Sequence, residues 1–181
     1  MKVVKFIKEN KIIVLALVIA LLSFAFLALP GQFAHYAANG KKTFFYNLNG
    51  YQWMFGTVKN SLGSKIGSAS AHGIAALSLL GVCVIGLVFS KKSSFVSLLT
   101  TLALITTAVL FFTISVAGAK AYPTFHNYGK GDYAYGWVPY LVGGLVVLAG
   151  LLMGYRTFKV MKDEVKRPTQ QKGPHYSYLH K

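Results

Sequence analysis

The sequence predicts an all-α membrane protein, a bundle of four transmembrane helices with a small extracellular β-hairpin in its first outer loop. Three observations lead to this fold class. Hydrophobic residues make up 54% of the chain and charged residues only 13%, whereas soluble domains carry about 25% charged residues. The apolar residues gather in long blocks near 12–29, 66–89, 95–117 and 137–155, and these blocks contain no Asp, Glu, Lys or Arg. Such blocks are typical of transmembrane helices.

The first block ends at Pro30-Gly31 and follows a lysine-rich segment, residues 1–11. Eighteen residues at 1.5 Å each span about 27 Å, which just crosses a bilayer core. A signal peptide is the alternative, because Ser23 and Ala25 offer small residues for cleavage. The apolar run continues past that position, so we expect an uncleaved anchor.

The second and third blocks are separated only by a few residues around Lys91-Lys92, which requires an antiparallel helix pair. The fourth block carries Trp137, Tyr140 and Tyr155 near its ends, where aromatic belts lie in membrane proteins. The basic tail, 156–181, begins as a continuation of this helix and is expected to be disordered after Pro168.

Basic residues predict the orientation. Thirteen of the nineteen Lys and Arg lie in the N-terminal tail, the 90–94 turn and the tail after Tyr155, and six lie in the connections 30–65 and 118–136. The positive-inside rule therefore places both termini in the cytoplasm of a multi-pass cell-membrane protein. The net charge of +15 favours anionic lipid headgroups at the cytoplasmic face as partners, and no basic patch indicates nucleic acid.

The first outer loop, 30–65, holds two aromatic runs, KKTFFYN and YQWMFG, on either side of Leu48-Asn49-Gly50. Asn-Gly between such runs favours a type I′ turn. We therefore expect a β-hairpin here. Since an isolated two-stranded ribbon is marginally stable, it should lean on the second outer loop, 118–136, whose tyrosines could supply a third extended segment.

Chemistry inside a membrane usually needs ionisable side chains, and the apolar blocks offer only His72. We therefore predict no catalytic residue, no metal site and no cofactor. His72 is expected to be an interfacial hydrogen-bonding residue, with a ligand or pH-switch role as the alternative. It forms the candidate polar site with two outer-loop residues, His126 and Asp132. The lone cysteine, Cys83, excludes an intramolecular disulfide.

Aromatic residues of the outer loops are the best candidates for partner binding, because such side chains are enriched in binding hot spots and at membrane interfaces. They are Phe45, Tyr51, Trp53, Phe55, Tyr128 and Tyr133. Small residues at helix-packing spacing should let the helices approach closely within the bundle, with an oligomer interface as the alternative. They are Gly67, Ala71, Ala75, Gly150 and Gly154.

The order of tails, helices and loops resembles the claudin-like tetraspan topology. The segment Gly50–Gly56, GYQWMFG, is similar to the Gly-x-x-x-x-Phe-Gly stretch of small four-helix membrane proteins of low-G+C Gram-positive bacteria. Claudins carry paired cysteines and a Gly-Leu-Trp element in the first loop, which this chain lacks, so barrier function does not follow. The bacterial resemblance implies a structural or accessory role without family chemistry.

Three functions remain open from the sequence. The first is a non-enzymatic membrane protein that binds a membrane-protein partner, or a second copy of itself, through its aromatic outer surface. The second is a small channel or transporter subunit, which the absence of charge in the apolar blocks disfavours. The third is a lipid-modifying enzyme, which would need the outer histidines and Asp132 to converge.

Overall fold

The computed structural model describes residues 10–30, 32, 34–37, 45–56, 69–91, 93–114 and 132–166. Four long helices lie side by side in an elongated bundle: α2 (Lys11–Leu27), α4 (Ala71–Phe89), α5 (Ser94–Phe112) and α7 (Val138–Lys166). Of these, α4, α5 and the Val138–Asp163 part of α7 are long and apolar enough to cross a membrane. Helix α2 is also apolar but has 17 residues. The chain is therefore a multi-pass membrane protein.

Each helix of the bundle has two neighbours. Helix α7 packs against α2 and α5, α4 packs against α5, and a smaller contact joins α2 to α4. Fully buried side chains such as Ala16, Leu80, Leu104 and Val146 fill the interior. Large apolar side chains on the outside of the same helices, among them Val82, Leu102 and Leu151, are at least half exposed. This surface suits lipid tails, which solvate apolar side chains as well as a protein core does.

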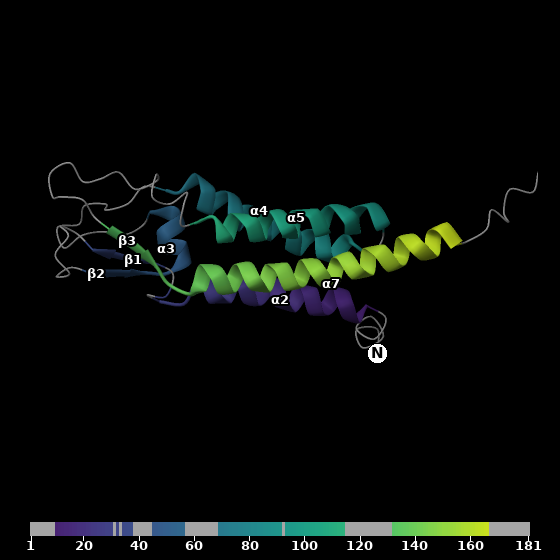
Figure 1. Ribbon diagram of the computed structural model, residues 1–181, viewed down its shortest axis with the longest axis horizontal. Coiled ribbons are helices and arrows are strands. Elements are labelled where there is room, and N and C mark those ends of the chain that lie inside the picture. Colours follow the sequence, from purple (N-terminus) through teal and green to yellow (C-terminus); the bar gives the residue numbers. More distant parts are fainter. Residues whose placement is uncertain are drawn as a thin grey trace, which may run out of the picture.

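The two ends of the bundle differ (Figure 1). One end, here called the sheet end, carries a three-stranded antiparallel sheet and the short helix α3 (Gly50–Phe55). The opposite end, here called the turn end, carries the start of α2, the turn from α4 to α5 and the last turns of α7. Helix α7 extends past the other helices at the turn end.

The sheet has the strand order β2-β1-β3, built from β1 (Ala34–Ala37), β2 (Phe45–Leu48) and β3 (Asp132–Tyr135). Ala34 pairs with Leu48 on one side and with Tyr135 on the other. The central strand β1, which follows α2, thus pairs with β3, which precedes α7.

The predicted hairpin across Asn49-Gly50 is wrong, because the run after it is helix α3 rather than a strand. A type I′ turn needs positive φ, but Asn49 has φ −83° and ψ 169°. Its side-chain oxygen accepts the backbone N–H of Gln52 at 2.8 Å, and the Gln52 side chain accepts the N–H of Asn49 at 3.1 Å. This capping box starts a helix. Strand β2 pairs instead with β1.

The long helices differ from the predicted blocks mainly at their ends. Helix α7 continues well beyond Tyr155, as predicted for the start of the tail, because no proline occurs before Pro168. Helix α4 begins at Ala71, where the Ser70 hydroxyl accepts the N–H of Gly73 at 3.1 Å. The earlier part of its predicted block, including Gly67, lies outside the described residues.

Candidate functional site

Helix α3 is fixed on the sheet end of the bundle by contacts with two long helices. The Tyr51 hydroxyl donates a hydrogen bond to the carbonyl of Phe24 in α2 at 3.0 Å. At the other end of α3, the backbone N–H of Ser70 donates to the carbonyl of Met54 at 2.8 Å. Gly56 ends the helix with φ 59°, a left-handed conformation that favours glycine. The helix is therefore part of the folded bundle and not a free loop.

Trp53 is fully buried, so its expected role in partner binding is wrong. It and Met54 are 0% exposed and pack over the first turn of α4 at Gly73. A Cβ atom at Gly73 would lie 2.8 Å from Met54 Cγ and 2.9 Å from Trp53 Cζ3, so the close approach depends on this glycine. Because a buried indole has no surface to offer, Trp53 anchors α3 to the bundle.

Tyr51 also acts within the chain. It is partly buried, and its hydroxyl is occupied by the Phe24 carbonyl. Burial raises the pKa of the Tyr51 phenol above its usual value of 10.0, because the phenolate would lose water around its charge. The contact of Tyr51 with α2 therefore anchors α3. Phe55 is the outward-facing aromatic residue of this helix and is 42% exposed.

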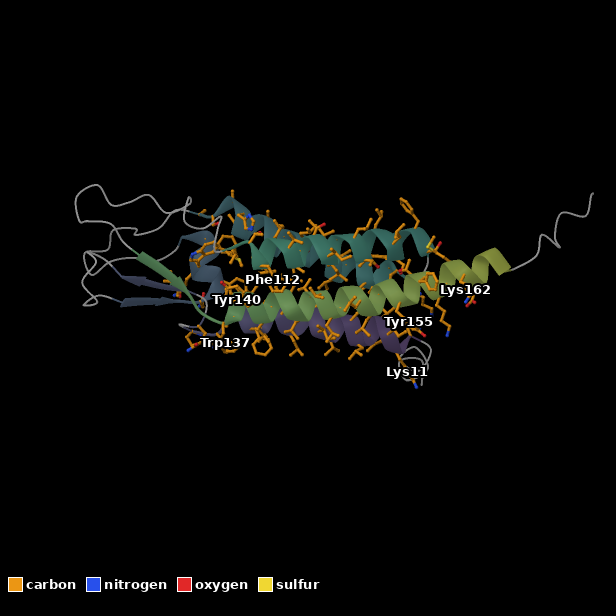
Figure 2. All side chains as sticks on the ribbon, in the orientation of Figure 1. Lys11, Phe112, Trp137, Tyr140, Tyr155 and Lys162 are labelled. Carbon is orange, nitrogen blue, oxygen red and sulfur yellow. The ribbon has the colours of Figure 1, made fainter. Side chains whose placement is uncertain are left out.

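Two more aromatic side chains are exposed at the start of α7 (Figure 2). Trp137 is 50% exposed, donates from Nε1 to the side-chain oxygen of Gln32 at 2.8 Å and meets Phe26 edge to face at 6.4 Å. Tyr140 is 46% exposed one turn further along. Both lie at the sheet end, where the apolar surface of the bundle ends, as residues of an aromatic belt do.

The other aromatic candidates are described only by their backbone or not at all. Phe45 on β2 pairs with Ala37 of β1, and Tyr133 on β3 pairs with Tyr36 of β1, so both belong to the same sheet. Tyr128 lies outside the described residues. The sheet, which carries Phe45 and Tyr133, and α3, which carries Phe55, lie together at the sheet end of the bundle.

His72 joins the start of α4 to the end of α5. Its Nε2 atom lies 2.8 Å from the carbonyl oxygen of Leu110, and since a carbonyl only accepts, Nε2 carries the proton in this contact. The hydroxyl of Thr113 donates to the Val109 carbonyl at 2.8 Å and can accept from His72 at 3.3 Å. This geometry is that of a helix-to-helix hydrogen bond.

Of the other two candidate polar-site residues, only Asp132 is among the described residues. Asp132 is the first residue of β3 and pairs through its backbone with Ala37. His126 lies outside the described residues. Among the residues that the structure describes, no group of three or more His, Cys, Asp or Glu residues could hold a metal ion.

A polar cluster at the turn end was not expected from the sequence. The hydroxyls of Ser97 in α5 and Thr157 in α7 lie 2.7 Å apart and are buried. Arg156 donates from Nη1 to Ser97 Oγ at 3.1 Å and to the carbonyl of Ser90 at 3.3 Å. The sequence signal for this cluster is the position of its polar residues. Ser97 and Thr157 both lie a few residues from the lysines that border their apolar blocks.

The helix-packing candidates divide in two. Gly150 faces Leu104 and Ile105 of α5, and Gly154 faces Thr101, so both lie in the contact between α7 and α5. Ala71 and Ala75 are exposed, so their predicted packing inside the bundle is wrong. The physical reason is the rotation of α4, which directs Gly73, Ala76 and Leu80 inward instead.

Sequence reasoning missed Gly86, whose position closely approaches the Thr100 side chain between α4 and α5.

Comparison with protein-family models gives no match, and comparison with curated proteins gives no significant match. The features that can support a function are therefore those of the chain itself: the apolar helices, the fixed α3 with its exposed Phe55, and the polar cluster at the turn end.

Proposed function

We propose that this protein is a non-enzymatic four-span protein of the cell membrane that binds a membrane-protein partner, or a second copy of itself, through the exposed face of α3 and the neighbouring sheet. In this proposal α2 crosses the bilayer with the three longer helices. The sheet end then faces outward and both termini lie in the cytoplasm, in contact with anionic headgroups.

The topology is supported by the geometry of α7. From Trp137 to Tyr155 the helix rises about 27 Å, which matches the thickness of a bilayer core of about 30 Å. Lys11 and Lys162 lie at the Tyr155 end, and Trp137 and Tyr140 lie at the sheet end (Figure 2). The positive-inside rule assigns the lysine-bearing end to the cytoplasm. The claudin-like layout, with no claudin loop motif, remains part of this proposal.

The observation that carries partner binding is the exposure of Phe55 on a fixed helix. Trp53 and Met54 beside it are 0% exposed, whereas Phe55 is 42% exposed. Because α3 is held by Tyr51 and by the Met54 carbonyl, Phe55 is displayed in a fixed position. A preorganised aromatic side chain loses little entropy on binding and is a favourable anchor for a partner.

The interior supports a scaffold more than a pore or an enzyme. Buried hydroxyls of α5 and α7 donate to carbonyls one turn earlier in their own helices: Thr100 to Val96, Thr101 to Ser97, Thr107 to Ala103 and Thr157 to Met153. Hydroxyls engaged in this way pack helices together and have little donor capacity left for a substrate or an ion.

Photo-crosslinking tests the proposal. A photoreactive phenylalanine analogue is placed at Phe55 in the full chain in native membranes, and a matched control carries it at Phe112, which is 43% exposed at the sheet end of α5. We expect one defined protein adduct from position 55 and lipid adducts from position 112. Co-purification of that partner in mild detergent should fail in Phe55→Ser. Monomer only, with no protein adduct from position 55, would remove the proposal.

A further inference from the structure

Helix α7 is longer than a bilayer requires. Its 29 residues from Val138 to Lys166 rise about 43 Å, whereas the hydrocarbon core is about 30 Å thick. With Trp137 at one interface, Tyr155 lies about 27 Å along the helix and Phe158 about 32 Å. The residues after Phe158 therefore lie at the depth of the lipid headgroups.

The outward face of α7 changes character at this depth. Leu148, Tyr155 and Lys162 are spaced by seven residues, so they lie on one side of the helix, and all three are exposed. Leu151 is 67% exposed, Tyr155 62% and Phe158 69%. Lys159 is also exposed and is four residues after Tyr155. Lys159 and Lys162 therefore follow directly after the lipid-facing apolar surface of α7. Phe158 lies beside them, at the end of that apolar surface.

The opposite side of this segment is held to the bundle. Thr157 is buried against Ser97, and the neighbouring Arg156 binds the Ser90 carbonyl at the end of α4 and the Ser97 hydroxyl. With these residues holding α7 against the α4–α5 turn, Lys159 and Lys162 are directed away from the bundle. Their position on the lipid-facing side is therefore set by the fold.

We propose that Lys159 and Lys162, with Phe158 beside them, form a binding site for the headgroup of an anionic phospholipid. The recognised chemistry is a phosphate on a diacyl lipid: the ammonium groups neutralise the phosphate while Phe158 contacts the upper part of the acyl chains. Charge complementarity supports this occupant, since two exposed lysines, Lys159 and Lys162, lie on this side of the helix and the nearest exposed acid is Asp163. The inference uses the membrane topology of the proposed function but is independent of a protein partner.

Spin-labelled lipids test the site. The full chain is reconstituted into phosphatidylcholine nanodiscs containing trace spin-labelled phosphatidylglycerol or phosphatidylcholine, and the immobilised fraction of each label is measured. We expect a several-fold preference for phosphatidylglycerol that falls roughly threefold or more in K159Q/K162Q. The matched control, K11Q/K91Q, removes two lysines from the same end and should keep the preference.

A second measurement addresses Phe158 directly. In a Cys83→Ala background, a nitroxide at Phe158→Cys should be accessible to oxygen dissolved in the lipid and protected from an aqueous nickel complex, and one at Asp163→Cys should show the reverse. Protection at position 158 supports the site even if K159Q/K162Q folds poorly.

Four results would overturn the inference. The first is a wild-type protein without a preference for phosphatidylglycerol, and the second is an equal loss of that preference in K11Q/K91Q. The third is displacement of the lipid by soluble glycerol phosphate. The fourth is a nitroxide at position 158 that is shielded by a bound protein instead of by lipid. None of them depends on the adduct from position 55, so failure of the lipid site and failure of partner binding are distinguishable.

Discussion

Arg156 of α7 donates a hydrogen bond from Nη1 to the Ser97 hydroxyl of α5 at 3.1 Å, and this contact connects residues 59 positions apart in the chain. Ser97 in turn lies 2.7 Å from the Thr157 hydroxyl, whose own hydrogen is directed to the Met153 carbonyl at 2.8 Å. Ser97 therefore accepts from Arg156 and donates to Thr157. The turn end of the bundle is closed by a connected set of hydrogen bonds in which each member has a defined donor or acceptor role.

This connection predicts the effect of removing one hydroxyl. Thr157→Val keeps the shape of the side chain but leaves Ser97 without its acceptor, and we expect the free energy of unfolding to fall by about 0.6 kcal/mol and by at most ~1.7 kcal/mol. Thr106→Val is the matched control, because Thr106 is exposed and its hydroxyl binds the Leu102 carbonyl of its own helix. Unfolding in mixed micelles measures both, and equal effects would contradict the cross-helix role.

The second prediction concerns the alkaline stability of the sheet end. Burial raises the pKa of Tyr51 in the folded protein above 10.0, so the folded state holds this proton more tightly than the unfolded state does. The stabilisation is fully present below pH 10.0 and is lost as the pH rises through the folded pKa. Tyr51→Phe should be less stable at neutral pH, because it lacks the bond to Phe24, and should lose less stability above pH 10. Unfolding measured against pH distinguishes the two proteins, and parallel curves above pH 10 would exclude this role for Tyr51.

The third prediction tests the start of α3. Asn49→Ala removes the side-chain acceptor of the Gln52 N–H, and loss of such a cap costs about 1 kcal/mol, which corresponds to roughly fivefold faster local exchange. The backbone amide of Gln52 should therefore exchange its hydrogen about fivefold faster, while amides in the middle of α5 remain unchanged. Asn49→Asp keeps an acceptor and serves as the control. An unchanged Gln52 amide in Asn49→Ala would mean that packing alone holds the helix.

How far the sequence predicts this fold depends on the range of the interactions involved. The three longest helices follow from runs of apolar residues, because bilayer thickness fixes how long such a run must be. Helix ends depend on local competition, as at Asn49, where the hairpin signal of Asn-Gly and the capping signal of Asn49 with Gln52 occur together. The capping box prevails because Trp53 and Met54 gain burial against α4 only when the segment is helical.

The candidate site was predictable only in part for the same reason. Outer-loop aromatics are visible in the sequence, but whether one is buried like Trp53 or exposed like Phe55 depends on the face of α3 that meets α4. Likewise the rotation of α4 decides that Gly73 faces the bundle and Ala71 does not. The partnership of Ser97 with Arg156 required the mutual position of α5 and α7, which no local pattern specifies.

The last prediction uses two glycines of α4 as a matched pair. A Cβ at Gly73 would lie within 3.0 Å of both Met54 and Trp53, whereas a Cβ at Gly81 meets nothing within 4 Å. Gly73→Ala must therefore displace α3 from the bundle, and we expect a loss of about 1–3 kcal/mol, the usual cost of overpacking. Gly81→Ala should be neutral or slightly stabilising, since alanine favours helix.

Because a displaced α3 carries Phe55 with it, Gly73→Ala should also weaken the partner adduct from position 55, while Gly81→Ala retains it. Unfolding and crosslinking yields measured on the same preparations test both effects. A Gly73→Ala protein with normal stability and a normal adduct would show that the contact of α3 with α4 does not position Phe55.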